Sequence, residues 1–380
     1  MKKGWETKTL GELCDVLDSK RKPITKRDRN AGEYPYYGAT GVLDHVAGYL
    51  FDEPLVLVGE DGAKWASGEN TAFAVEGKIW VNNHAHVLRP HRNTLLDNWL
   101  IYHLNHTDLT EFVSGLTVPK LNQGSLREIP VPVPPLAEQQ RIVGLLDEAF
   151  EGLATAKANA EKNLQNARAL FESHLQSVFT QRGPGWKQKT LEEIATTFGR
   201  GKSKHRPRNE PKLYGGKYPF IQTGDIRNAN HFITEYSQTY SELGLAQSKL
   251  WPKGTICITI AANIAETAIL GFDACFPDSV IGVVANPKEA EVGFIEYLLQ
   301  SFKARIQALG KGSAQANINM GTFEHERFPF PPVAEQKRIV EKLDALSEET
   351  QRLARLYERK HAALEALKKS LLHQAFTGEL

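Results

Sequence analysis

The sequence predicts an α+β protein built by internal duplication: two small mixed α/β domains are separated by two long antiparallel helices, a coiled coil with pseudo-twofold symmetry. The first observation behind this prediction is a repeat. Residues Pro134 to Val143 recur 197 positions later as Pro331 to Val340, and both copies read Pro-Pro-x-Ala-Glu-Gln-x-Arg-Ile-Val. The second observation is that the stretches before each copy share landmarks but differ in length, which is typical of a duplicated domain that has diverged in its middle.

Each copy of the repeat is predicted to form one long helix. The copies run without insertion or deletion for about 45 residues, to Thr180 and Thr377. At 1.5 Å per residue each helix is roughly 65 Å long. Apolar residues recur at steps of three and four, which is typical of a coiled-coil seam. They are Ile142, Leu146, Ala149, Leu153, Ala156, Ala160, Ala167, Phe171 and Val178 in the first copy, and Ile339, Leu343, Leu346, Leu353, Tyr357, Leu364, Leu367 and Leu371 in the second. Packing of each helix on its own domain is the alternative.

The domain boundaries follow from proline and glycine. The alternating prolines of 129–135 and 328–332 end each domain, and Gly183-Pro184-Gly185 ends the first helix. The predicted segments are a first domain at 1–133, a first helix at 134–180, a second domain at 181–330 and a second helix at 331–380. Shared landmarks open the two domains: Gly-Trp, then a Thr-Leu-x-Glu capping box, then Tyr-Pro-aromatic.

Inside the domains, short β-rich runs alternate with turns and one or two helices, which predicts a mixed α/β or α+β domain without fixing its topology. The predicted strands are Leu55–Val58, Ile79–Val81, His86–Leu88, Thr255–Ile260 and Val280–Val284, and helices are expected around Trp99–Tyr102 and Phe294–Tyr297.

Composition favours a cytoplasmic protein. Of 380 residues, 41% are hydrophobic and 24% charged, with a net charge of +1. The most apolar run, Thr255 to Phe272, is interrupted by Asn263 and Glu266 and is too polar to cross a membrane. The opening residues are polar, so no signal segment is expected. Three scattered cysteines without a C-x-x-C spacing indicate neither a disulfide framework nor a zinc site.

Catalytic motifs are missing from the sequence. Gly201-Lys202-Ser203 has Thr196 where a phosphate-binding loop needs glycine. Pro277-Asp278 is not followed by the Asp/Glu-x-Lys of a nuclease, and His84 and His86 have no evident further metal ligands. We therefore expect no catalytic or metal site and no cofactor bound by this chain. The chain is therefore predicted to be a binding protein without catalytic activity. Two alternatives remain: a self-sufficient enzyme whose site lacks a recognisable motif, and a coiled-coil adaptor that does not bind nucleic acid.

Basic residues cluster at the same place in both copies, between the Gly-Trp and Tyr-Pro-aromatic landmarks. A matched pair of basic segments favours contact with phosphates, which is sequence-independent and weakens with salt. The segments contain Lys20, Arg21, Lys22, Lys26, Arg27 and Arg29 in the first domain, and Arg200, Lys202, Lys204, Arg206, Arg208 and Lys212 in the second.

Side chains able to read bases by paired hydrogen bonds are expected on loops. The candidates are Tyr37, Lys64, Trp65, Asn82, Asn83, His84, Lys120, Asn122 and Gln123 in the first domain, and Gln222, Thr223, Asp225, Arg227, Asn263, Gln315, Asn317 and Asn319 in the second. Asn and Asp are also common turn formers, so a structural role is the alternative for each.

The repeat, the Gly-Trp openings, the stretch from Tyr218 to Ile226 and the ending Ala375 to Leu380 together resemble the DNA-specificity (S) subunit of type I restriction–modification systems. The resemblance covers essentially the whole chain. The first domain departs from the family's commoner Thr-Gly-Asp-Ile by having Tyr37-Gly38-Ala39-Thr40-Gly41.

The resemblance implies two target-recognition domains that read the halves of a split, asymmetric site in double-stranded DNA, and helices that set the spacer. It also implies that the helices dock two methyltransferase subunits, and that the full assembly adds restriction subunits. S-adenosylmethionine, ATP and magnesium would be bound by those partners. The candidate partner-binding residues are Glu138, Gln139, Arg141, Glu335, Gln336 and Arg338.

Overall fold

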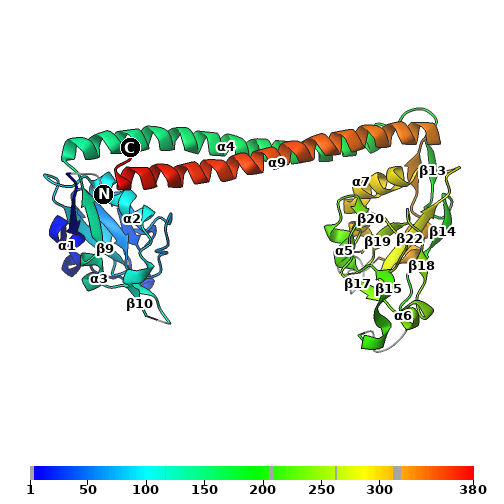
Figure 1. Ribbon diagram of the computed structural model, residues 1–380, viewed down its shortest axis with the longest axis horizontal. Helices are drawn as coiled ribbons and strands as arrows, with labels where there is room; N and C mark the ends of the chain where they lie inside the picture. Colours follow the sequence, from blue (N-terminus) through cyan, green and yellow to red (C-terminus); the bar gives the residue numbers. More distant parts are fainter. Residues whose placement is uncertain (1–3, 116, 205–208, 262, 311–317) are drawn as a thin grey trace. The chain divides into compact units, whose positions relative to one another are not determined.

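The structure is a computed structural model that describes residues 4–380 except 116, 205–208, 262 and 311–317. The chain divides into two compact units (Figure 1). The first unit contains residues 1–162 and 357–380, and the second contains residues 163–356. Each unit therefore holds one globular domain, part of the first long helix and part of the second. Below, the first domain means residues 4–133 and the second domain residues 185–330.

The first domain has two four-stranded sheets. One has the strand order β2-β9-β6-β7 and the other β4-β3-β8-β5. The strands are β2 Cys14–Val16, β3 Ala31–Gly38, β4 Gly41–Val46, β5 Phe51–Asp52, β6 Leu55–Gly59, β7 Ala72–Val75, β8 Lys78–Val81 and β9 Ala85–Pro90. A short hairpin pairs β10 Val113–Ser114 with β11 Lys120–Leu121.

The second domain repeats this topology. Its sheets have the orders β14-β22-β19-β20-β16 and β17-β15-β21-β18, which match the first domain strand for strand except for the added edge strand β16. The strands are β14 Ala195–Arg200, β15 Tyr214–Phe220, β16 Phe232–Ile233, β17 Gln238–Tyr240, β18 Leu250–Trp251, β19 Ile256–Thr259, β20 Thr267–Leu270, β21 Ala274–Cys275 and β22 Val280–Ala285. This topology could not be predicted from the sequence.

A two-stranded antiparallel ribbon joins each domain to its following helix. It pairs β1 Glu6–Thr9 with β12 Pro130–Val133, and β13 Lys187–Lys189 with β23 Phe328–Phe330. The alternating prolines are tolerated because each proline-containing strand pairs on one side only.

The shorter helices follow the predicted landmarks. The capping box at Thr9 starts α1 Leu10–Leu13. Thr190 and Glu193 make the same two hydrogen bonds, but the residues that follow form turns instead of the expected helix. The remaining helices of eight residues or fewer are α3 Gln123–Arg127, α5 Thr223–Asn228, α6 Glu242–Ala246 and α8 Met320–Glu324. The helices expected around Trp99 and Phe294 are α2 Asp97–His106 and α7 Val292–Gly310.

The two long helices are confirmed, and both have 45 residues: α4 Leu136–Thr180 and α9 Val333–Thr377. They are antiparallel in the first unit, where Lys157 pairs with Glu365 at 2.6 Å and Glu161 with His361 at 3.2 Å. Most of the predicted seam is buried or half-buried, but Leu367 is 47% exposed. Its equivalent on α4, Leu170, is 52% exposed. Leu367 therefore lies outside the seam, because the steps of three and four also fit a neighbouring helix face.

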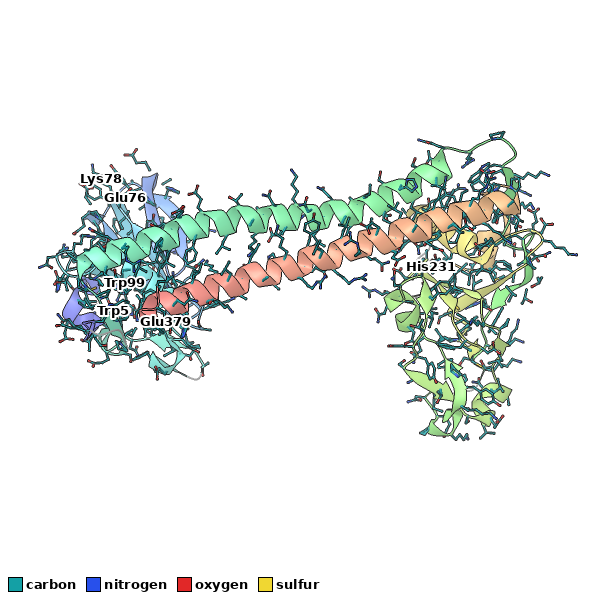
Figure 2. The ribbon with its side chains drawn as sticks, turned by 45° about the horizontal axis from the view of Figure 1, so that its top comes forward. Trp5, Glu76, Lys78, Trp99, His231 and Glu379 are labelled. Carbon is teal, nitrogen blue, oxygen red and sulfur yellow. The ribbon has the colours of Figure 1, made fainter. Side chains whose placement is uncertain are left out.

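Each domain packs against both long helices. In the first unit, Trp99 of α2 lies 5.7 Å from Trp5 and 4.7 Å from Phe376 near the end of α9, measured between ring centroids. In the second unit the equivalent Phe294 lies 6.1 Å from Trp186 and 5.4 Å from Phe179 near the end of α4. These aromatic groups belong to the main core of each unit. Figure 2 labels Trp5 and Trp99 beside the end of α9.

Among the described residues, no helix combines the length and apolar character needed to span a membrane. Two mixed domains with one repeated topology and two long antiparallel helices confirm the predicted fold class.

Candidate nucleic-acid interface

A buried ionic cluster organises the loops of the first domain. Arg21 pairs with Asp18 at 3.3 Å and with Glu60. Lys120 pairs with the other oxygen of Glu60 at 2.8 Å, and His86 lies 2.6 Å from Asp18. These side chains come from the turn after β2, the end of β6, the start of β9 and β11. The cluster therefore fixes four separate segments against one another.

The cluster is satisfied by its own charges. The Nε2 of His86 lies 2.7 Å from the carbonyl oxygen of Leu121, which can only accept, so this nitrogen donates while Nδ1 faces Asp18. Burial raises the pKa of Asp18, but the hydrogen bond and charge of His86 and the Gln123 amide outweigh it, so the pKa is lowered overall. Asp18, Glu60 and His86 have metal-ligand spacing, yet Arg21 and Lys120 already neutralise both carboxylates. This donor set fits a salt-bridge cluster and does not fit a metal ion.

The exposed rim of this cluster holds several of the predicted base-reading residues. His84 pairs with Asp61, and Lys120 lies 3.8 Å from the same carboxylate. Gln123 donates to Asp18 at 3.0 Å. The structure thus brings His84, Lys120 and Gln123 together. The neighbouring candidates Asn83 and Asn122 are also exposed.

Two candidates of the first domain are core residues. Trp65 is 8% exposed, and its indole N–H donates to the carbonyl of Gly59 at 3.1 Å. Asn82 is 3% exposed, and its side-chain oxygen accepts from the backbone N–H of His84 at 2.8 Å. Their buried polar groups hold the loop shape, so the prediction that they contact DNA directly is corrected.

The remaining two candidates of this list lie elsewhere on the domain. Tyr37 is half-buried against Phe73, with ring centroids 6.0 Å apart, and burial raises the pKa of its hydroxyl. Lys64 is exposed and lies 3.7 Å from Glu69.

The basic segment of the first domain divides into two kinds of residue. Arg21 and Arg29 are largely buried in ion pairs, Arg29 with Asp44 at 3.1 Å and above the ring of Tyr36 at 4.4 Å. Their guanidinium groups shape the segment, which corrects the prediction that they contact phosphates. The exposed cations are Lys20, Lys22, Lys26 and Arg27.

The described residues of the second domain's basic segment are exposed. Arg200 donates to the backbone oxygen of Asp278 at 2.7 Å, and Lys202 and Lys204 lie on the surface of the following loop. The predicted residues Arg206, Arg208, Gln315 and Asn317 lie outside the described residues.

Sequence reasoning missed Lys249. Its ammonium group lies 3.6 Å from the ring centroid of the buried Trp251. Desolvation, and then the charge of Lys202, lower its pKa. Two cations lie together here without a carboxylate pairing with either one in the described part of the chain. No signal in the sequence identifies Lys249, because only tertiary folding brings its segment to Lys202, 47 residues earlier, where the hydroxyl of Ser248 donates to the backbone oxygen of Lys202 at 2.8 Å.

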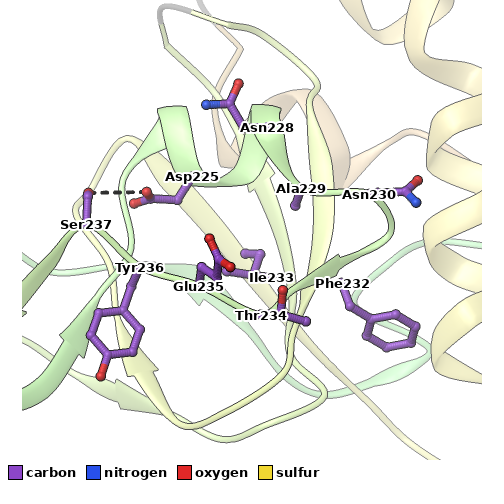
Figure 3. A pocket seen from close by; sticks show the side chains of 10 residues that line it. All are labelled: Asp225, Asn228, Ala229, Asn230, Phe232, Ile233, Thr234, Glu235, Tyr236 and Ser237. Atoms are coloured by element: carbon purple, nitrogen blue, oxygen red, sulfur yellow. Dashed lines mark hydrogen bonds between the residues drawn. The ribbon is translucent and has the colours of Figure 1, made fainter. Parts of the chain in front are cut away.

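Asp225 of α5, a predicted base-reading residue, lines a pocket of about 770 Å³ between this helix and the 229–237 segment (Figure 3). Asp225 accepts from the backbone N–H of Gln222 at 2.8 Å and from the hydroxyl of Ser237 at 3.2 Å. Gln222 in turn donates to Gln238 at 2.7 Å. Glu235 and Tyr236 also line the pocket and were not predicted.

Three further candidates surround this helix. Arg227 is exposed and donates to the side-chain oxygen of Asn263 at 3.4 Å, and Thr223 begins the helix. Thr223, Arg227 and Asn263 therefore lie close together at α5.

Asn122 and Asn319, which are equivalent in the repeat, occupy N-cap positions of α3 and α8. Asn319 accepts from the backbone N–H of Thr322 at 3.1 Å, so its side chain caps the helix, which is the structural alternative.

At the start of the long helices the structure separates the predicted partner-binding residues. Gln139 and Gln336 are 0% exposed and hydrogen-bonded inside their units. A side chain with no accessible surface cannot bind a partner, so this part of the prediction is corrected. Arg141 and Arg338 are exposed and Glu138 and Glu335 are half-buried, so all four keep accessible surface.

A repeated mixed domain with polar loops and exposed cations, carried by long paired helices, defines a two-domain DNA-binding protein. The family described as type I restriction modification DNA specificity domain matches residues 2–164 and again residues 184–358. The chain belongs to this family.

Similar proteins and structures agree. A Haemophilus influenzae protein assigned as a type I restriction enzyme specificity subunit is 28% identical over 89% of this chain and 86% of its own length. The MjaVIII specificity subunit of Methanocaldococcus jannaschii is 22% identical over 99% of this chain and 93% of its own. The fold matches a chain from a type I restriction–modification complex over 100% of this chain and 99% of that one, with a TM-score of 0.76 and 19% identity. It matches the HsdS subunit of Thermoanaerobacter tengcongensis over 100% and 98%, with a TM-score of 0.62 and 18% identity.

Proposed function

We propose that this chain is the DNA-specificity subunit of a type I restriction–modification complex, in which each domain binds one half of a bipartite, asymmetric target. The observation that carries this proposal is the strand-for-strand repeat of one topology with different side chains on its loops. Two domains with the same strand order and different loops are suited to binding two different DNA sequences in the same way.

The contacts proposed for each domain use residues whose side chains are exposed or half-buried. Phosphates are bound by Lys20, Lys22, Lys26 and Arg27 in the first domain and by Arg200, Lys202, Lys204 and Lys249 in the second. Bases are read by Asn83, His84, Lys120 and Gln123 in the first domain and by Gln222, Arg227 and Asn263 in the second.

The chain is proposed to have no catalytic activity of its own and to work in the cytoplasm. Two methyltransferase subunits bind S-adenosylmethionine, and restriction subunits, where present, use ATP and magnesium. The purified chain, free of partner subunits, should neither methylate nor cleave DNA in the presence of S-adenosylmethionine and magnesium. Methyl transfer or cleavage by such a preparation would support the self-sufficient enzyme instead.

The half-site assignment is tested by exchanging residues 185–330 for the matching domain of another family member. Only one half of the bound sequence should change, because each domain has its own sheets and core. A change in both halves contradicts the proposal. Failure of the unmodified chain to bind duplex DNA in a salt-dependent way would favour the adaptor alternative.

The spacer role of the helices is tested by deleting seven residues from each helix, at 159–165 in α4 and 354–360 in α9. Both helices must be shortened because they pair. Seven residues rise about 10.5 Å and turn the helix by nearly two full turns, so the same faces stay in contact. At 3.4 Å per base pair the spacer should shorten by about three base pairs while both half-sites stay the same. Replacing the same fourteen residues without deletion is the control, and an unchanged spacer after deletion contradicts the role.

Methyltransferase docking is proposed to use Leu170 and Leu367, together with Glu138, Arg141, Glu335 and Arg338. The two leucines are equivalent in the repeat and both are about half exposed, which suits two copies of one partner. Leu170→Asp and Leu367→Asp should reduce co-purification of the methyltransferase subunits without lowering the Tm. Leu356 is the matched control, since it is 42% exposed but its equivalent on α4 is Asn159.

A further inference from the structure

One tyrosine–aspartate hydrogen bond occurs at the same place in both units. Tyr102 of α2 donates to Asp147 of α4, and Tyr297 of α7 donates to Asp344 of α9 at 2.7 Å. Burial, followed by the neighbouring carboxylate, raises the pKa of both tyrosines, so each hydroxyl keeps its proton as a donor. The bond joins a helix of the globular domain to a long helix in each unit.

A second attachment lies at the start of each long helix. The side-chain oxygen of Gln139 accepts from the backbone N–H of Leu96 at 2.9 Å, and its nitrogen donates to the carbonyls of Thr94 and Pro134. Gln336 makes the matching bonds to Glu291, Glu289 and Pro331. The glutamine and the aspartate are eight residues apart, or roughly 12 Å along the helix.

Two directional bonds at separate points along a helix restrict rotation of the domain against it. The apolar contacts between α2 or α7 and the long helices give most of the stability, but burial of apolar surface has no preferred direction. The hydrogen bonds do have a preferred direction. Their repetition in two domains whose loops have diverged points to a shared task that is independent of which bases are read.

In the second unit the tyrosine also contacts the segment that leads to the α5 pocket. His231 stacks on Tyr297 with ring centroids 4.6 Å apart, and its Nδ1 lies 2.7 Å from the fully buried Glu296. The backbone of His231 has a φ of 66°, a left-handed conformation held by these contacts. The adjacent Asn230 lines the α5 pocket and donates to Gln351 of α9 at 3.1 Å. Figure 2 labels His231 beside the long helices, and Figure 3 shows Asn230 at the edge of the pocket.

We propose that Tyr102 and Tyr297 are positioning residues that set the orientation of each recognition domain on its long helix, and through it the spacer length that the chain accepts. This inference rests on the proposed function. Neither tyrosine touches DNA in this scheme. Each acts through the aspartate of the long helix, and the half-site sequences are read by other residues.

The test is selection of bound duplexes from a random-sequence library by the full-length chain, followed by sequencing. The unmodified chain should retain two half-sites at one spacing. Tyr297→Phe and Tyr102→Phe should retain the same half-sites but increase the share of spacings one base pair longer or shorter by roughly threefold to tenfold, the net contribution of one typical intramolecular hydrogen bond. A purely structural loss would lower binding at every spacing equally. Tyr49→Phe, at an exposed tyrosine of the first domain, and Tyr218→Phe, which removes a hydrogen bond to Glu242 away from the long helix in the second domain, are the matched controls.

The aspartate variants give an independent measurement should a tyrosine variant fold poorly. Asp344→Asn keeps an oxygen that can accept from Tyr297 and should keep the single spacing, whereas Asp344→Ala should broaden it. If the unmodified chain enriches no bipartite sequence, the proposed function itself fails. If it enriches one, and the tyrosine and alanine variants keep its spacing distribution, only the positioning role is overturned.

Discussion

The first and second domains share one strand order, yet their cations are held differently. In the first domain Arg21, Arg29 and Lys120 are each paired with a carboxylate, and Asp18 and Glu60 are buried with them. In the second domain the ammonium group of Lys249 lies over Trp251, and neither Lys249 nor the nearby Lys202 pairs with a carboxylate in the described residues.

This difference teaches that a shared basic segment does not have one role. Cations that pair with buried carboxylates hold the loops of the domain in place, whereas cations without a carboxylate partner can attract phosphates. We therefore expect the first domain to present a fixed polar loop surface, and the second domain to supply more of the salt-dependent affinity.

The largest expected effect is the loss of stability when an aromatic ring is removed from one unit or the other. Phe179→Ala removes a buried ring from the second unit, and Phe376→Ala removes its equivalent from the first unit. Phe179→Ala should cost about 3–5 kcal/mol of unfolding free energy, and Phe376→Ala less, because Phe376 is only partly buried. Hydrogen exchange should show weakened protection in residues 186–330 for Phe179→Ala and in residues 4–133 for Phe376→Ala. Weakening of the opposite domain would break the assignment of each helix end to its unit.

A somewhat smaller effect tests the ionic cluster. Arg21→Met leaves two buried carboxylates without their guanidinium group and should lower the unfolding free energy by about 3 kcal/mol at neutral pH. Arg200→Met, at an exposed position of the second domain's basic segment, should change it by no more than about 0.5 kcal/mol. Chemical denaturation measures both, and similar values for the two variants would contradict the contrast between the domains.

The two units should also differ in pH dependence. Burial lowers the pKa of His103 to about 4, while its Nε2 donates to the carbonyl of Pro130 at 2.8 Å. The folded state therefore binds this proton less readily than the unfolded state. The first unit should be fully stabilised above about pH 6.5 and should lose roughly 2–3 kcal/mol as the pH falls toward 4.

The pKa of His231 is shifted in the opposite direction from that of His103, so its contribution to stability has the opposite pH dependence. Burial lowers its pKa, but the hydrogen bond and charge of Glu296 outweigh this and raise it overall. Its contribution is present below the unfolded pKa and is lost as the pH rises through the folded value. Thermal unfolding of His103→Leu and His231→Leu at pH 5 and pH 8 checks both signs. The leucine at 103 copies Leu298, its equivalent in the second domain.

The smallest effect concerns Lys249. Lys249→Gln should reduce the slope of log affinity against log salt by about 0.9, the loss of one phosphate contact. Lys253→Gln, an exposed lysine on the other side of Trp251 in sequence, is the control. An unchanged slope for Lys249→Gln would remove the second domain's proposed advantage in phosphate binding.

The sequence was sufficient for most features governed by local periodicity. The predicted strands and the two long helices depend on neighbours in the chain, and both helices have 45 residues. Leu367 and the turns after Thr190 are exceptions, because tertiary packing decides which helix face is buried and whether a helix continues from a capping box. The strand order was not predictable, because pairings such as β2 with β9 join segments about 70 residues apart.

The candidate site was predictable only as a set of loops. Trp65 and Asn82 have the residue types of base readers, but only tertiary packing decides that they are buried. Gln139 and Gln336 hydrogen-bond each domain to its long helix. A residue repeated in both copies can serve either this structural role or partner binding, and the repeat alone does not distinguish the two. Lys249 could not be recognised from the sequence, because the loop that carries Lys202 meets the 248–249 segment only in the folded domain.

The first unit contains the C-terminal part of α9, and the second unit contains the C-terminal part of α4. This arrangement has a consequence during synthesis. The core of the first unit includes Leu372 and Ala375, with Phe376 packed against it, and these residues leave the ribosome after every residue of the second unit. The first domain is thus synthesised before the second but completed after it. Until residues 372–376 emerge, the surface around Trp99 lacks the end of α9, so the nascent chain exposes an apolar face.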